Sequence, residues 1–213
     1  MNIKELKITI EDFFSLEDEY ETKTHFNDFE KNFPATVKHD FNYGNSSKLY
    51  PHVFAAEILA REMPSTQDHH PELLYLACSY GFGPKFFNSL GYDVIGIDLN
   101  IKAIAMARKN GLDCRLMNAL ALDFENDSFD GIISRDFLRE DYHVETENIK
   151  LCIIEQYRVL KENGIAVSYS MVHDEKLHEK YMKELPFSIL KRYKIVTNPN
   201  FDKLLFYVDV FVK

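Results

Sequence analysis

The sequence contains few cysteines and no excess of basic residues, and both shortages exclude classes of function. Only three cysteines occur in 213 residues, at positions 78, 114 and 152, with no C-x-x-C pair and no histidine at metal-ligand spacing. We therefore expect no metal site and three buried thiols in a reducing compartment. Acidic residues outnumber basic ones by 34 to 25, a formal charge of -9. No run of Lys or Arg is dense enough to follow a phosphate backbone, so nucleic acid is not an expected partner.

Long hydrophobic segments are also missing. No window reaches the length of a membrane-spanning helix, and the N-terminus carries acidic residues where a signal peptide would be apolar. We therefore expect no membrane association and a cytoplasmic location. The adjacent His69 and His70 are interpreted as part of a solvated loop, because neighbouring side chains diverge and no partner ligand is in range. The length of 213 residues suits one large domain with a sheet covered on both faces.

The stretch from residue 72 to residue 100 predicts a strand, helix and strand around a tight turn. An apolar strand, Leu73–Leu76, leads into a turn of small residues, Ala77–Gly83. A helix then begins near Pro84 and ends at Gly91, and a second strand, Asp93–Asp98, closes on an acid. Small turn residues admit a ligand close to the backbone, and the terminal acid can accept both hydroxyls of a ribose. A dinucleotide or an adenosyl cofactor would fit equally well. The third glycine of the dinucleotide fingerprint is absent.

Strands and helices continue to alternate after this unit. Asn100 can cap a helix, and three further strands are expected at 114–117, 129–134 and 165–169, with Gly164 ending the helix before the last of them. Two β runs at 187–196 and 203–212 are separated by too few residues for a crossover helix, so they must pair antiparallel. We predict an α/β, Rossmann-like, doubly wound and mostly parallel sheet of seven strands that ends in an antiparallel hairpin.

The first 62 residues differ in character from residues 63–213. Leu6, Ile10 and Phe14 lie four apart and predict an amphipathic helix, and Pro51 can begin a second one. This region is expected to be a helical cap over one face of the sheet. It could instead be a lid that shapes a substrate pocket, with Tyr43, Tyr50 and His52 as lining. The aromatic residues between positions 26 and 50 could also cover the sheet of a second copy, which would make the protein a homodimer.

Five sequence patterns from position 74 onward occur in a characteristic order. They are a strand and turn with Leu74, Tyr75, Ala77, Ser79 and Gly81; Asp98 closing the second strand; Asn118 after the third; the segment Ser128–Ser134; and Glu155, Arg158, Val159, Leu160, Lys161 and Gly164 in the pattern E-x-x-R-V-L-K-x-x-G. Together they resemble the class I S-adenosylmethionine-dependent methyltransferases, of type 11 or 25, over roughly residues 72–213. The terminal hairpin is also what that family shows.

The resemblance implies S-adenosylmethionine as cofactor and S-adenosylhomocysteine as product. The residues implied in cofactor binding are the turn with Ala77, Cys78, Ser79 and Gly81 beside the methionine and ribose, Asp98 with Leu99 at the ribose, Asn118 with the Ala119 amide at the adenine, and Ser134 with Arg135 at the methionine end. Because the sulfonium is already activated, the protein mainly has to align the acceptor and exclude water. A general base is needed only where the acceptor carries a proton.

The first motif departs from the family pattern. Tyr75 stands in place of an acid, and Ala77 and Ser79 replace two glycines. An Ala or Ser can follow the same backbone path only if no positive φ angle is needed there. Tyr75 could pack in the core under the turn or contact the cofactor. Two other functions are therefore weighed: a catalytically silent methyltransferase-like module that binds a metabolite or a protein, and a nicotinamide-dependent oxidoreductase, which the incomplete glycine pattern and the terminal hairpin disfavour.

The acceptor is poorly marked. No N-P-P-Y-like stretch follows the fourth strand, which disfavours the amino-group methyltransferases of adenine and glutamine and leaves a small-molecule acceptor as the expectation. Polar residues follow the fourth and fifth strands at the expected ligand edge: Arg135, Asp136, Glu140, Asp141, Tyr142, His143 and His173. His143, His173 and Asp136 are the catalytic candidates, since a neutral imidazole is available near pH 7. Each could equally be a solvated loop residue.

Overall fold

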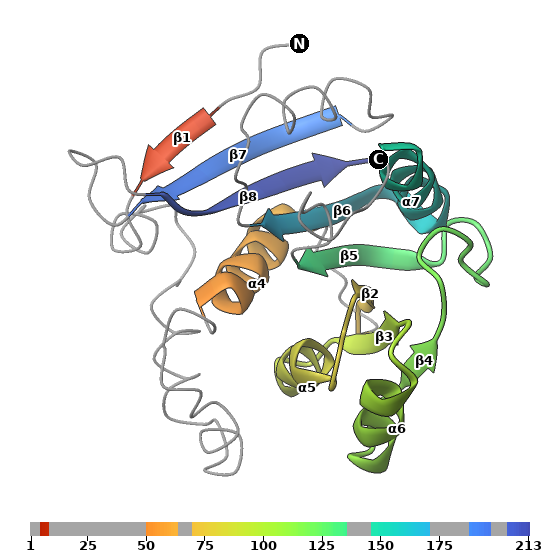
Figure 1. The fold of residues 1–213 in the computed structure, drawn as a ribbon. Helices are drawn as coiled ribbons and strands as arrows, with labels where there is room; N and C mark the ends of the chain where they lie inside the picture. The colour runs from red at the N-terminus through yellow and green to blue at the C-terminus, as the bar shows by residue number, and fades with distance from the viewer. Residues whose placement is uncertain (1–4, 9–49, 64–69, 136–145, 171–187, 197–203) are drawn as a thin grey trace.

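The described residues form a mixed sheet of eight strands at the centre of the molecule (Figure 1). The computed structural model describes residues 5–8, 50–63, 70–135, 146–170, 188–196 and 204–213. The strands are β1 (Glu5–Ile8), β2 (Glu72–Leu76), β3 (Asp93–Asp98), β4 (Cys114–Leu116), β5 (Phe129–Arg135), β6 (Leu160–Ser170), β7 (Ser188–Val196) and β8 (Leu204–Val212). Their spatial order is β1-β7-β8-β6-β5-β2-β3-β4.

Strand direction follows the predicted pattern. Neighbouring strands from β6 to β4 are all parallel, and β8 runs antiparallel to both of its neighbours, β6 and β7. The predicted α/β architecture and its terminal antiparallel hairpin are therefore confirmed. Because β2 lies between β3 and β5, the chain reverses its direction of winding beside β2, and the carboxyl ends of these strands meet at one edge.

The predicted number of seven strands is wrong for this structure, which has an eighth. Residues 5–8 were expected to be helical, but they form β1, which pairs parallel with β7. The alternation of Leu6 and Ile8 with Glu5 and Lys7 has the period of a strand, and pairing with a distant strand prevails over the weaker helical spacing. A helix is present later in the predicted cap region, and the division of the chain at residue 62 stays a prediction.

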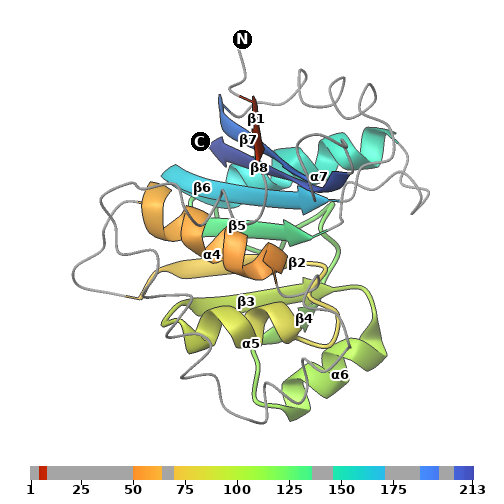
Figure 2. The same ribbon diagram turned by 90° about the vertical axis from the view of Figure 1, so that its left-hand side faces the viewer.

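Four described helices cover the two faces of the sheet: α4 (Tyr50–Glu62), α5 (Phe82–Ser89), α6 (Ile101–Lys109) and α7 (Thr146–Val159). Figure 2 shows α4, α5 and α6 on the near face and α7 on the opposite one. Successive side chains of β2 point to opposite faces of the sheet. Leu73 and Tyr75 pack with α4 and α5, whereas Leu74 and Leu76 pack with α7. Apolar side chains on both faces are typical of a central parallel strand.

Helix ends follow the sequence signals in α6 and differ from them in α7. The side chain of Asn100 caps α6, accepting hydrogen bonds from the N–H groups of Lys102 (3.1 Å) and Ala103 (3.2 Å). Gly164, predicted to end α7, instead lies inside β6, because α7 ends at Val159 and the next residue already pairs with Phe129. No described helix is long and apolar enough to span a membrane.

Candidate cofactor site

The turn after β2 has a left-handed backbone at three residues. Ala77 has a φ of 53°, Ser79 a φ of 49° and Gly81 a φ of 85°. Glycine adopts such angles freely, whereas Ala and Ser are strained there by about 1–2 kcal/mol each. Ala77 and Ser79 therefore have positive φ angles, at which a residue with a Cβ was not expected from the sequence. Side chains of Ala77 and Ser79 are exposed, so this face of the turn is open.

Cys78 lies in the same turn but faces inward. Its side chain is buried, and its backbone N–H donates to the carbonyl of Ile97 at 2.9 Å. A hydrogen bond with the Cys114 thiol, together with burial, raises the pKa of the Cys78 thiol. All three cysteines are free thiols in buried positions, as the sequence predicted. Only the backbone of Cys78 can therefore face a ligand at this edge.

Asp98, the last residue of β3, joins the turn to the start of α6. Its Oδ2 accepts a hydrogen bond from the Ser79 N–H, and its Oδ1 accepts one from the Asn100 N–H, both at 2.8 Å. The residue is half-buried. Each oxygen has a second lone pair beyond the one used here, so the carboxylate can accept two further hydrogen bonds. This geometry suits a pair of neighbouring hydroxyls, as in a ribose.

Asn118 and Ala119 follow β4 at the same edge. Asn118 is exposed, and its Oδ1 accepts a hydrogen bond from the Leu120 N–H at 3.0 Å. Ala119 is only 7% exposed, so only its backbone is available to a ligand. Leu99 is 68% exposed beside Asp98. The structure thus brings the predicted ribose and adenine residues to one edge of the sheet.

Three exposed apolar side chains near this edge were missed from the sequence. Tyr80 in the turn is 58% exposed, Ile101 at the start of α6 is 65% exposed and Leu116 at the end of β4 is 49% exposed. Each lies within two residues of a predicted ligand residue. Such side chains could cover the flat faces of a base.

Ser134 and Arg135 end β5 next to β2 and β6. Ser134 pairs with Leu76 on one side and Ser168 on the other, and its side chain is only 3% exposed. Arg135 is described only as part of the strand. The catalytic candidates Asp136, His143 and His173 lie outside the described residues, as do the other polar residues proposed near the acceptor.

Tyr75 is a core residue rather than a side chain at the open edge. It is 2% exposed, and its hydroxyl hydrogen-bonds to the Tyr169 hydroxyl at 2.7 Å and to Nε2 of His52 at 3.0 Å. His52, predicted as a possible pocket lining, is itself 1% exposed in this cluster. Gly83 is required beside the ring, because a Cβ there would lie 2.2 Å from Tyr75 Cε2. The core-packing interpretation of Tyr75 is confirmed.

The middle of the chain is similar to a known protein family. Residues 74–168 match the family model described as a methyltransferase domain. This match is consistent with the class I S-adenosylmethionine-dependent methyltransferase superfamily. An uncharacterised protein of Haemophilus influenzae is 31% identical over 110 residues, which are 47% of this chain and 43% of that protein. The chain thus spans less than half of that relative.

Solved structures show the same fold at low sequence identity. A methyltransferase of Methanosarcina mazei is 20% identical with a TM-score of 0.58, covering 68% of this chain and 93% of that one. A methyltransferase of Archaeoglobus fulgidus is 12% identical with a TM-score of 0.63, covering 84% and 100%. A [4+2]-cyclase shares the fold at 16% identity and a TM-score of 0.58, covering 76% and 81%. The methyltransferase fold therefore hosts more than one reaction, and the site must decide between them.

Proposed function

We propose that this methyltransferase domain uses S-adenosylmethionine to methylate a small-molecule acceptor by direct in-line transfer. The observation that carries the proposal is the Asp98 carboxylate, which is half-buried at the end of β3 and held by the N–H groups of Ser79 and Asn100. The left-handed turn beside it supports the same conclusion, because backbone strain at Ala77 and Ser79 is retained where a ligand would approach.

The residues at the edge fit the parts of this cofactor. Asp98 would accept the ribose hydroxyls, the open backbone from Ala77 to Gly81 would follow the methionine and ribose, and Asn118 with the Ala119 amide would bind the adenine. When bound, the cofactor supplies a methyl group already activated by a sulfonium. This chain would then have to orient the acceptor and keep water away from the methyl.

On the acceptor side, the proposal uses the polar residues that follow β5 and β6. His143, His173 and Asp136 are proposed as the groups that remove a proton from the acceptor where it carries one. We also propose a cytoplasmic location and a homodimer formed through the aromatic N-terminal segment. Light scattering of the full chain tests the dimer, which a monomeric full chain would contradict.

Calorimetric titration with S-adenosylmethionine and S-adenosylhomocysteine tests the cofactor. We expect micromolar binding by the wild type and loss of at least tenfold in affinity in Asp98→Asn, which keeps the side-chain shape but removes the charge. Asp93→Asn is the matched control, because this exposed acid lies at the other end of β3. Its affinity should equal that of the wild type.

Failure of the wild type to bind either compound would reject the enzyme and favour the catalytically silent module. If binding is seen, methyl transfer from labelled cofactor to a panel of small acceptors comes next. Transfer to protein or nucleic acid, with none to small molecules, would contradict the acceptor class.

A further inference from the structure

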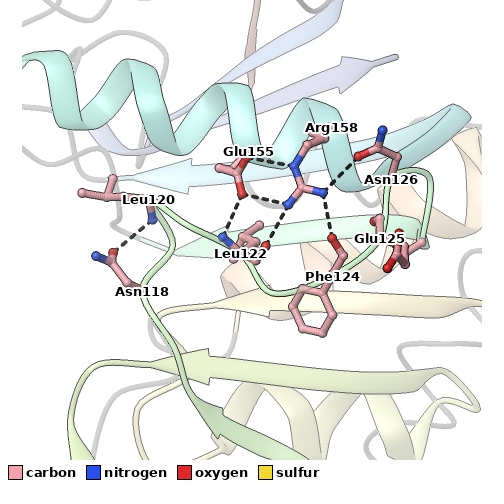
Figure 3. Close-up of polar contacts among 9 residues, drawn as sticks. Asn118, Leu120, Leu122, Phe124, Glu125, Asn126, Glu155 and Arg158 are labelled. Atoms are coloured by element: carbon pink, nitrogen blue, oxygen red, sulfur yellow. Dashed lines mark hydrogen bonds and ion pairs between the residues drawn. The ribbon is translucent and has the colours of Figure 1, made fainter.

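Arg158 near the end of α7 uses every N–H of its guanidinium group. Nε donates to Glu155 Oε1 at 2.9 Å (Figure 3). One terminal nitrogen donates to the Phe124 carbonyl at 2.7 Å and to Asn126 Oδ1 at 3.1 Å. The other terminal nitrogen donates to the Leu122 carbonyl and to Glu155 Oε2, both at 2.8 Å. Five donors therefore have five acceptors, which a guanidinium achieves only where its surroundings are built to match.

Glu155 completes the arrangement from the preceding turn of the same helix. Its Oε2 accepts a hydrogen bond from the Leu122 N–H at 2.8 Å while also pairing with Arg158. The guanidinium holds the pKa of the Glu155 carboxyl below its usual range. Both the N–H and the carbonyl of Leu122 are thus held by α7, more than thirty residues away in the chain.

The segment held in this way begins with the proposed adenine residues. Between β4 and β5 the chain has no regular structure, so its backbone groups need partners outside a helix or a strand ladder. Asn118 starts a turn in which its Oδ1 accepts from the Leu120 N–H and its carbonyl accepts from the Ala121 N–H. The next residue is Leu122. The turn that carries Asn118 is therefore fixed on one side by β4 and on the other by Glu155 and Arg158 (Figure 3).

Packing alone does not account for this polar cluster. Leu122 and Ala119 bury their side chains in the cluster formed by α7 and the sheet, whereas Glu155 and Arg158 contact backbone groups of the loop. The charged groups act instead on backbone positions and so determine the path of the loop. Lys161 offers a contrast from the same region, since it pairs with Asp130 at 3.0 Å and Glu72 at 3.2 Å and holds no part of the loop.

We propose that Glu155 and Arg158 are positioning residues that hold Asn118 and the Ala119 amide in the geometry that distinguishes adenine from other bases. The inference rests on the proposed cofactor site. It predicts that loosening the loop weakens recognition of the adenine edge while the ribose contact at Asp98 remains.

The first measurement compares two ligands that differ only at that edge. S-adenosylhomocysteine carries an amino group at the purine 6-position, and S-inosylhomocysteine carries a keto group there. In the wild type we expect S-adenosylhomocysteine to bind about tenfold more tightly, the value of roughly one hydrogen bond. In Glu155→Gln and in Arg158→Lys the two ligands should bind with affinities that differ by no more than about twofold. Lys161→Gln is the control, which loses an ion pair but should keep the wild-type ratio.

The second measurement needs no ligand. Hydrogen exchange at the Leu122 and Leu120 amides should become at least tenfold faster in Glu155→Gln and Arg158→Lys and stay unchanged in Lys161→Gln. A purely structural role would lower the melting temperature of all three variants and leave the ligand ratio at the wild-type value, which would overturn the proposal. Unchanged exchange would overturn it as well. Absence of binding to the wild type, with faster exchange in the two variants, would instead reject the cofactor site on which the proposal rests.

Discussion

Two residues without the freedom of glycine adopt left-handed angles in the turn after β2. Ala77 and Ser79 stand where the family pattern has glycines, and the sequence alone raised the question whether the turn keeps its shape. Both residues have positive φ angles, of 53° and 49°, which favour glycine. The cost falls on stability, because a residue with a Cβ is strained at such angles.

Ala77→Gly should therefore stabilise the protein. The change removes about 1–2 kcal/mol of backbone strain and adds about 0.5–1 kcal/mol of unfolded-state entropy, so the net gain is about 0.5–1 kcal/mol. Urea denaturation measures it. Ala105→Gly, at an exposed position within α6, is the control and should lose about 1 kcal/mol. A loss of stability in both variants would show that Ala77 is unstrained.

Tyr75→Phe should destabilise the protein without affecting cofactor affinity. It removes a hydroxyl that hydrogen-bonds to His52 and Tyr169 in the buried core, for an expected loss of about 1–3 kcal/mol. S-adenosylhomocysteine affinity, measured by calorimetry, should stay within twofold of wild type. Tyr80→Phe, at an exposed tyrosine of the turn, is the stability control. Reduced affinity with unchanged stability would place Tyr75 at the ligand instead.

At the scale of elements, the start of α5 depends on a close approach to β2. Gly83, in the first turn of the helix, lies over the Tyr75 ring, and a Cβ there would be 2.2 Å from Cε2 and 2.3 Å from Cζ. The hydroxyl contacts hold this ring in place, so it cannot easily swing aside. Helix and strand are thus fitted to each other at one glycine.

Gly83→Ala should cost about 2–3 kcal/mol, because either the ring or the helix must move. Gly91→Ala makes the same chemical change at the end of α5, where nothing lies within 4 Å and only the φ of 91° opposes it. About 1 kcal/mol is expected there. Thermal unfolding of the two variants compares them, and equal losses would show that the contact with Tyr75 relaxes without cost.

At the scale of the whole molecule, the free energy of unfolding should fall at high pH, because Tyr92 is buried near Glu57 of α4 in the folded state. Burial, together with the charge of Glu57 on α4, raises the pKa of Tyr92 to about 12. The folded state thus holds this proton more tightly than the unfolded chain, whose tyrosines titrate near 10. The contribution is complete below about pH 10 and is lost as the pH rises towards 12.

Tyr92→Phe tests this linkage. Wild-type stability should fall by up to about 2 kcal/mol more than that of the variant between pH 9 and 12, after allowance for the partial exposure of the ring. Urea denaturation at a series of pH values measures the difference. Parallel pH profiles for the two proteins would mean that Tyr92 ionises normally in the folded state.

Local patterns predicted much of the sheet and one side of the site. The strand Asp93–Asp98 has the expected bounds, Asn100 caps α6 as predicted, and the hairpin pairs antiparallel. These features depend on neighbours in the sequence or on a loop too short for any other connection. The convergence of the turn, Asp98 and Asn118 follows from parallel strand order, which the alternation of strands and helices already required.

Contacts between distant segments decided the rest. Residues 5–8 form a strand because they pair with the edge of β7, 187 positions later in the chain. Tyr75 became a core residue because His52 and Tyr169 come from α4 and β6, and no local pattern names such partners. The sequence by itself determined the elements and the ligand edge, since these follow from local periodicity and chain direction. Only the tertiary structure decided which side chains face that edge and which are buried in the core, because burial depends on the neighbours that pack around a residue.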